Sequence, residues 1–197
     1  MGVQERKQRQ RESLKSRILE TARDIATKDG WDAVSMRRIA ESIEYTAPVI
    51  YSHFKDKDDL LKELVGEGFR LLDGAAEKAR QGEATAEAKL RAVAKAYWKF
   101  AFENPEYYQV MFNLQGVLCK SAKNADSEAP ANPFAATIAE VLFAKGRDAA
   151  EAPEILHSFF SILHGFVSFA MAQKFHWTNQ ESETHMEKAV DRLIRSI

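Results

Sequence analysis

Residues Ser35–Phe54 constrain the fold more than any other stretch of this 197-residue chain. Apolar side chains recur there at three- and four-residue intervals, which is the spacing of one helix face. They are Met36, Ile39, Ala40 and Ile43, followed after a short break by Val49, Ile50 and Phe54. Two short helices joined by so tight a turn cross at a steep angle, so the pattern predicts a helix-turn-helix unit. The second helix of such a unit can enter the major groove of DNA.

Both helices of this unit carry start signals. Ser35 precedes the first helix and Thr46 the second, and both residue types accept hydrogen bonds from free backbone N–H groups at a helix start. Pro48 falls in the first turn of the second helix, where its missing N–H is tolerated. A proline there disfavours helical angles at Ala47, so we expect the start of the second helix to be tilted or shortened.

The same helical spacing continues through the rest of the chain, and no strand-like alternation interrupts it. Further helices are expected at about residues 12–28, 55–80, 85–103, 106–114, 133–145, 153–175 and 179–197. The polar stretch 119–132 is expected to form an exposed loop. The sequence therefore predicts an all-α fold of about nine helices, with a three-helix N-terminal helix-turn-helix head joined by a long helix to a C-terminal helical bundle.

The first eleven residues are polar and basic and show no apolar periodicity. We expect residues 1–11 to form a flexible basic arm, either as a solvated tail or reaching a minor groove through Arg6–Arg11. Net charge is −1 overall, but residues 1–57 carry 12 basic and 9 acidic side chains. A basic end on an acidic remainder is a common layout for a binding head with a separate body, with chance asymmetry as the alternative.

Three features indicate a cytoplasmic protein without a membrane partner. The single cysteine, Cys119, cannot form an internal disulfide, which fits a reducing compartment. The N-terminus lacks the apolar core of a signal peptide. No apolar run is expected to approach the ~18–20 residues of a spanning helix.

Several motifs together resemble the TetR (tetracycline-repressor-like) family of transcriptional regulators. They are Ile39-Ala40-Glu41, Val49-Ile50-Tyr51, His53-Phe54, Lys57 and Leu60-Leu61, and they extend the resemblance over residues 12–62. Asn104-Pro105-Glu106-Tyr107-Tyr108 and Leu163-His164-Gly165 resemble a subclass with an aromatic-His-Gly signature, although Leu163 stands where that signature has an aromatic residue. The turn departs from the family pattern at Glu44, where the family usually has glycine.

The resemblance implies a homodimeric regulator that binds a palindromic operator in double-stranded DNA and is released by a small-molecule inducer. It implies a DNA-binding domain at residues 12–57 and a ligand-binding and dimerisation domain at residues 58–197. We expect the dimer to form through the helices at 153–175 and 179–197, because together they carry more apolar surface than one body can cover.

The resemblance and the position of the second helix imply a set of DNA-contacting residues. Tyr51 and His53 match backbone-contacting positions of the family, and Lys57 and Ser35 stand at helix starts that favour phosphate. Arg37 is a further candidate for the backbone, with plain solvation as the alternative. The side chains expected to face the groove, suited to thymine methyl groups, are Thr46, Ala47, Pro48, Val49 and Ser52.

Aromatic side chains and one histidine are candidates for an inducer pocket, with an ordinary core as the alternative. They are Trp98, Phe102, Tyr108, Phe112, Phe160 and His164, which would suit a largely apolar or aromatic ligand. Glu154, His157 and His164 suggest a metal site, but a di-iron bundle needs two Glu-x-x-His motifs and the chain has one. We therefore expect no metal, no cofactor and no enzymatic activity. A helical-bundle metal-dependent enzyme and a DNA-independent dimeric interaction module remain the alternatives.

Overall fold

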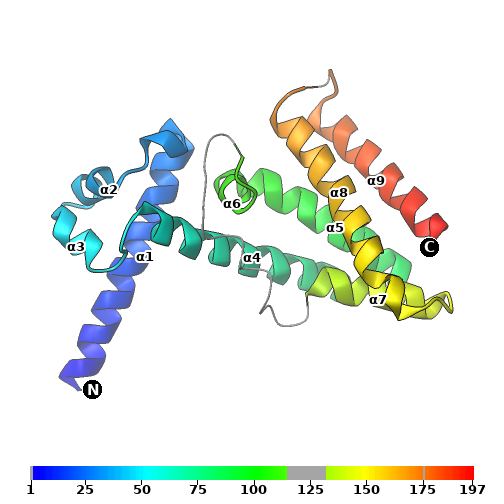
Figure 1. The fold of residues 1–197 in the computed structure, drawn as a ribbon, viewed down its shortest axis with the longest axis horizontal. Helices are drawn as coiled ribbons and strands as arrows, with labels where there is room; N and C mark the ends of the chain where they lie inside the picture. Colours follow the sequence, from blue (N-terminus) through cyan, green and yellow to red (C-terminus); the bar gives the residue numbers. More distant parts are fainter. Residues whose placement is uncertain (1, 115–131, 175) are drawn as a thin grey trace. The chain divides into compact units, whose positions relative to one another are not determined.

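The structure, a computed structural model, describes residues 2–114, 132–174 and 176–197. Within those ranges the chain forms nine α-helices and two short 3-10 helices, and no strand, so the predicted all-α fold is confirmed (Figure 1). The α-helices are α1 (Val3–Asp29), α2 (Met36–Ser42), α3 (Ala47–Tyr51), α4 (Lys57–Gln81), α5 (Ala86–Glu103), α6 (Pro105–Met111), α7 (Pro133–Ala144), α8 (Ala152–Met171) and α9 (Asn179–Ser196). The 3-10 helices are η1 (Trp31–Ala33) and η3 (Ala149–Glu151). Most of the predicted loop at 119–132 lies outside the described residues.

The described residues fall into two compact units. The head unit contains residues 2–69 and 105–114, and the body unit contains residues 70–104 and 132–197. The division therefore lies within α4, not at the expected boundary between residues 57 and 58. The short helix α6 belongs to the head unit, although its neighbours in sequence belong to the body unit.

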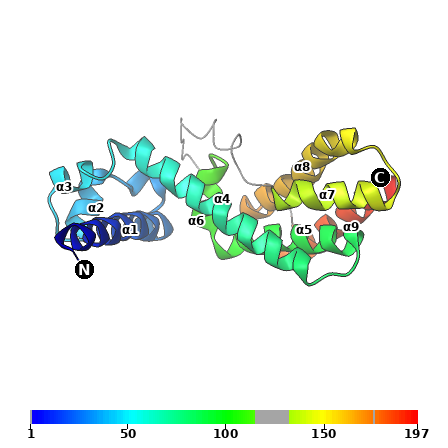
Figure 2. The ribbon, with the colours of Figure 1, turned by 90° about the horizontal axis from the view of Figure 1, so that it is seen from below.

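The head unit has its own core, built where α1, η1, α2 and α3 meet (Figures 1 and 2). Its apolar members are Ile18, Ala22, Ile25, Trp31, Ile39, Ile50 and Phe54, all buried. Trp31 is only 2 % exposed, and its 3-10 helix η1 packs against α1. This core fixes α2 and α3 against α1.

The expectation of a flexible arm at residues 1–11 is wrong for the described residues, because α1 begins at Val3. The Gly2 N–H donates to the Glu5 carboxylate at 3.0 Å, and the Gln8 amide donates to Glu12 at 2.8 Å. Both contacts stabilise the first turns of the helix. Residues 2–13 are exposed, so this part of the helix has no apolar face. Periodicity alone could not distinguish such a helix from a solvated tail.

Helix α6 packs against α1 and α4 inside the head unit. The Arg23 guanidinium lies 4.8 Å from the centre of the Tyr107 ring. A Cβ added at Gly68 on α4 would lie 2.5 Å from Met111 Sδ and 3.3 Å from Tyr107 Cδ1. Burial and a hydrogen bond with Glu67 raise the pKa of Tyr107. The absence of a side chain at Gly68 is therefore what lets α6 approach α4 so closely.

The body unit packs α5, α7, α8 and α9 together, with α8 and α9 side by side (Figure 1). Arg91 on α5 pairs with Asp191 on α9 at 2.7 Å, and Lys95 pairs with Glu187 at 3.0 Å. Glu140 on α7 accepts hydrogen bonds from Arg80 and, at 2.8 Å, from Lys89. These ion pairs connect helices that are far apart in sequence.

Helix α8 is apolar beyond the face that the body unit covers. Its fully buried residues are Phe159, Leu163 and Val167, whereas Phe169 is 49 % exposed. The segment Ala149–Met171 is long and apolar enough to cross a membrane, with a mean hydropathy of 1.3 in its most apolar window. The expectation that no run approaches this length is therefore wrong. Length and composition alone do not separate a spanning helix from the core helix of a soluble protein.

Candidate nucleic-acid interface

Hydrogen bonds at both ends of α2 define the helix and the turn that connects it to α3. Ser35 caps α2 by accepting a hydrogen bond from the Arg38 N–H at 3.2 Å, as predicted. At the other end, Tyr45 N–H donates to the Ala40 carbonyl at 2.9 Å and Glu44 N–H to the Glu41 carbonyl at 3.3 Å. This is a Schellman motif, which requires a left-handed residue after the cap. Glu44 occupies that position with φ of 60°.

Helix α3 is short. Thr46 occupies the N-cap position but its side chain makes no capping hydrogen bond, and Ala47 and Pro48 form the first turn. The helix ends at Tyr51, before the predicted end at Phe54. The Ser52 hydroxyl donates to the Val49 carbonyl at 2.7 Å, which satisfies one of the last free carbonyl groups. The result is a five-residue helix that presents its side chains mainly from its first turn and its end.

The structure places all ten predicted DNA-contacting residues in the head unit, within α2, α3 and the start of α4 or next to the ends of α2 and α3. Six are exposed, namely Ser35, Arg37, Thr46, Pro48, Tyr51 and Ser52. Four are half-buried, namely Ala47, Val49, His53 and Lys57. Tyr51 is 53 % exposed, which leaves its hydroxyl accessible. Whether any of the ten contacts DNA stays a prediction.

Contacts and charges within the chain already act on three of these residues, Arg37, Lys57 and His53. The Arg37 guanidinium pairs with Glu41 at 2.8 Å, on the surface of α2. The Lys57 ammonium donates to the Trp31 carbonyl at 2.9 Å, and its partial burial lowers its pKa while Asp32 opposes that shift. Burial lowers the pKa of His53, and the charges of Arg11 and Lys15 lower it further. His53 is therefore disfavoured as a cation near neutral pH.

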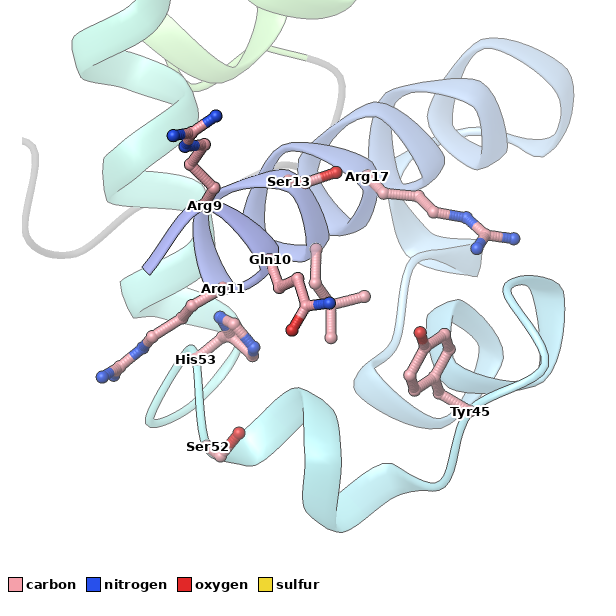
Figure 3. Close-up of a pocket in the computed structure, with 9 residues that line it drawn as sticks. Arg9, Gln10, Arg11, Ser13, Arg17, Tyr45, Ser52 and His53 are labelled. Carbon is pink, nitrogen blue, oxygen red and sulfur yellow. The ribbon is translucent and has the colours of Figure 1, made fainter. Parts of the chain in front are cut away.

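A polar groove beside α3 includes residues that the sequence did not single out (Figure 3). It has a volume of about 1020 Å³ and lies between α1 and the two ends of α3. The lining residues are Arg9, Gln10, Arg11, Ser13, Leu14, Arg17, Tyr45, Ser52 and His53. Gln10, Leu14 and Arg17 follow helical spacing, a signal that the interpretation of residues 1–11 as an arm concealed.

Of the residues predicted to line an inducer pocket, Trp98 and Tyr108 are buried and the other four are half-buried, and several of their rings pack against one another. In the body unit, the ring centres of Trp98 and Phe102 are 4.6 Å apart, and those of Phe160 and Tyr97 are 6.0 Å apart. In the head unit, the Tyr108 and Phe112 ring centres lie 4.7 Å apart. No cavity described above involves them. The pocket assignment therefore stays a prediction.

His164 lies half-buried on α8, with its Nε2 3.2 Å from the Ser168 hydroxyl. Burial lowers its pKa, so the neutral ring is favoured. A separate cavity of about 290 Å³ lies near the α8–α9 connection, lined by Phe169, Ala170, Gln173, Trp177, Thr178, Asn179 and Ser182. Within the described ranges, no three His, Cys, Asp or Glu side chains are grouped so as to hold a metal ion.

A helix-turn-helix head joined by sequence to a separate all-α unit defines the class of helix-turn-helix transcriptional regulators. Residues 18–64 match the family model for bacterial regulatory proteins of the tetR family, and residues 90–193 match a model for a tetracyclin repressor-like C-terminal domain. The chain belongs to the TetR family.

Known proteins similar to this chain include regulators and solved structures. The transcriptional repressor KstR of Mycolicibacterium smegmatis is 37 % identical over 70 residues, which cover 36 % of this chain and 34 % of KstR. A Rhodococcus protein of unknown function shares the fold with a TM-score of 0.72 and 24 % identity, covering 93 % of this chain and 95 % of that one. The TetR-family regulator PfmR of Thermus thermophilus has a TM-score of 0.64 and 18 % identity, covering 90 % and 97 %.

The matches to curated relatives are partial. The chain covers 48 %, 62 % and 34 % of the length of three such relatives, all of them helix-turn-helix regulators. They show that this chain is a regulator by family.

Proposed function

We propose that this protein is a ligand-responsive transcriptional repressor that binds a palindromic DNA operator as a homodimer in the cytoplasm. The observation that carries this proposal is the exposed surface of α3 and its flanks. Thr46, Pro48, Tyr51 and Ser52 are all exposed there, on or beside a helix that packs against α2 and buries Ile50. A rigid support with exposed polar and apolar side chains suits base reading in a major groove.

Homodimerisation is proposed through α8 and α9. One protomer leaves Phe169 and Trp177 about half exposed, and much of α8 is only half-buried. A second copy related by two-fold symmetry would cover this apolar surface. Two heads separated by about one helical turn of DNA, ~34 Å, would then match a palindrome.

Inducer binding is proposed in the body, by a largely apolar or aromatic compound. The support is the number of aromatic side chains around Trp98 and Phe160, together with a half-buried, neutral-favoured His164 that could supply one polar contact. Such a mixture of apolar walls and few polar groups is typical of small-molecule sites. The ligand would act by favouring dimers whose heads do not fit the operator.

The test of the DNA-binding function is fluorescence anisotropy with duplexes from the region upstream of the protein's own coding sequence, compared with a scrambled duplex. We expect the upstream duplex to bind at least 10³-fold more tightly than the scrambled one at physiological salt. Tyr51→Phe removes one exposed hydroxyl and should weaken both duplexes equally if it contacts a phosphate. Equal affinity of the wild-type protein for the two duplexes would overturn the proposal.

The test of the inducer is native mass spectrometry of the purified protein. A co-purified compound would appear as a mass above that of the polypeptide, and Trp98→Ala should remove it if Trp98 lines the site. Lys99→Ala, an exposed neighbour on α5, is the matched control. A bound mass that persists in the Trp98 variant would place the ligand elsewhere.

A further inference from the structure

The groove beside α3 is formed by a helix, not by a flexible arm, and this changes what the N-terminal basic residues can do. Gln10, Ser13, Leu14 and Arg17 line it from α1, whereas Tyr45 lines it from the turn before α3. Ser52 and His53 line it from the end of α3 (Figure 3). The groove therefore adjoins both ends of the helix proposed to read DNA.

The groove is strongly basic, and its basic side chains are uncommitted. Arg9, Arg11 and Arg17 line it, and among the described residues its lining includes no acidic side chain, whereas residues 2–17 as a whole contain six basic and two acidic side chains. Both acidic groups act within the helix, because Glu5 caps Gly2 and Glu12 accepts from Gln8. Lys15 pairs with Glu63 at 2.9 Å, but within the described part of the chain Arg11 and Arg17 take part in no ion pair.

Arg11 and Arg17 border the groove from different sides. Figure 3 shows the Arg11 side chain on the side of Ser52 and His53, and Arg17 on the side of Tyr45. They are six positions apart in α1, which is ~9 Å along the helix axis. That distance corresponds to about two to three nucleotides of one DNA strand at ~3.4 Å each.

We propose that this groove holds the sugar-phosphate backbone of the operator, with Arg11 and Arg17 as phosphate-contacting residues. The proposal rests on the proposed function, because it assigns the DNA backbone next to the major groove that α3 would enter. Arginine and neutral polar side chains are the groups that contact phosphates in protein–DNA complexes, and Gln10, Ser13 and Tyr45 supply the neutral ones. A helix presents these groups already ordered, so binding loses less conformational entropy than with a flexible arm.

The proposal predicts how DNA affinity depends on salt. Each phosphate contact contributes about −0.9 to the slope of log K against log salt concentration. Removing two contacts in Arg11→Gln/Arg17→Gln should therefore reduce the magnitude of that slope by ~1.8. The affinity for upstream and scrambled duplexes should fall by the same factor, because backbone contacts carry no sequence information.

Two matched variants separate charge at this site from charge in general. Arg11→Lys/Arg17→Lys keeps both charges in the groove and should keep the wild-type slope to within about 0.5. Lys78→Gln/Lys99→Gln removes two exposed charges from the body unit and should leave the slope unchanged. Far-UV circular dichroism of the full-length variants verifies that α1 remains helical in each.

The outcomes distinguish this proposal from the proposed function. If the wild-type protein prefers the upstream duplex but the glutamine variant matches the body-unit control, the groove assignment is overturned and the repressor proposal stands. If the wild-type protein binds both duplexes equally and the glutamine variant loses the expected slope, the groove assignment stands and the repressor proposal fails. Binding to neither duplex would overturn both.

Discussion

The Lys57 ammonium nitrogen lies 2.9 Å from the backbone carbonyl oxygen of Trp31 and donates a hydrogen bond to it. The contact joins the first residue of α4 to the 3-10 helix η1, across the base of the helix-turn-helix unit. An ammonium group has three N–H donors, so two remain for a phosphate. Lys57 therefore forms a structural contact within the head unit, and its proposed phosphate contact would be made in addition to it.

Replacing Lys57 with methionine should lower the free energy of unfolding by about 1–2 kcal/mol. The physical reason is the loss of a charge-assisted hydrogen bond to a partly buried carbonyl group. Lys55→Met is the matched control, because Lys55 is exposed two residues earlier and carries the same charge. Urea denaturation at pH 7 measures both. Equal stability of the two variants would show that the Trp31 contact contributes nothing.

Replacing Glu44 with glycine should stabilise the head unit by about 1 kcal/mol. Glu44 has φ of 60°, a conformation in which the Cβ of an L-residue is crowded by its own backbone. Glycine has no Cβ, so it adopts this conformation without that crowding. Glu44→Ala keeps the Cβ and should give no such gain. Thermal unfolding measures both variants, and an equal increase in their midpoint temperatures would show that the Cβ at this position is not strained.

Gly68→Ala and Gly74→Ala should have opposite effects, although both lie in α4. A Cβ at Gly68 would lie 2.5 Å from Met111 Sδ and should reduce stability by about 1–3 kcal/mol, as overpacking does. A Cβ at Gly74 meets nothing within 4 Å, so alanine there should add up to about 1 kcal/mol of helix stability.

The double variant Gly68→Ala/Met111→Ala checks the cause. Shortening Met111 makes room for the new methyl group, so the two changes should destabilise by less than their sum in chemical denaturation. Strict additivity would mean that the Met111 side chain moves aside without strain.

His164 should make stability depend on pH. Burial lowers its pKa in the folded state, so the unfolded chain binds more protons below about pH 6.5. Its contribution is therefore present above pH 6.5 and is lost as the pH falls through the folded-state pKa. His53 shifts in the same direction, so His164→Gln should reduce this loss without abolishing it.

An NMR titration of the histidine ring signals measures this pKa. The signals that are absent from the spectrum of His164→Gln belong to His164. His157→Gln, an exposed change on the same helix, controls for the loss of a histidine. A His164 midpoint at or above 6.5 would contradict the burial argument.

The dimer should depend on Phe169. Phe169→Asp places a charge on the apolar surface of α8 and should shift the protein from dimer to monomer, because an unpaired charge is costly to bury. Phe143→Asp changes an 85 % exposed phenylalanine on α7 and should leave the dimer intact. Sedimentation velocity at micromolar concentration measures both, and a dimeric Phe169→Asp protein would move the interface elsewhere.

Helical periodicity predicted the long elements of this fold well, because apolar faces buried against neighbours leave a clear pattern. The cap at Ser35 was predicted separately, from a residue type that accepts hydrogen bonds at a helix start. Helical periodicity failed at residues 3–11, where helix formation depends on capping and on side-chain pairs such as Gln8–Glu12, not on an apolar face. It also included Phe54 in the second motif helix, which ends at Tyr51. Phe54 follows the helix and is buried all the same, so its spacing matched the helical pattern.

The candidate site was predicted where it follows the family motif and missed where it depends on three-dimensional proximity. Thr46, Tyr51 and Ser52 were proposed from their positions in the helix-turn-helix unit, and the structure places all three on its exposed surface. Arg17 was not, because nothing in the sequence indicates that it lies near Tyr45. The tie between Lys57 and Trp31 was equally invisible, since the two residues are 26 positions apart.

The membership of α6 in the head unit means that the DNA-binding part of this protein is not one continuous piece of chain. A fragment ending at residue 69 would lack Tyr107, which covers Arg23, and Met111, which covers Gly68. A chimera that joins only residues 1–69 to the body of another regulator would therefore lack α6 and leave its packing surface uncovered. A working chimera would also have to carry residues 105–114 of this protein. The recipient regulator would then supply the segments before and after them.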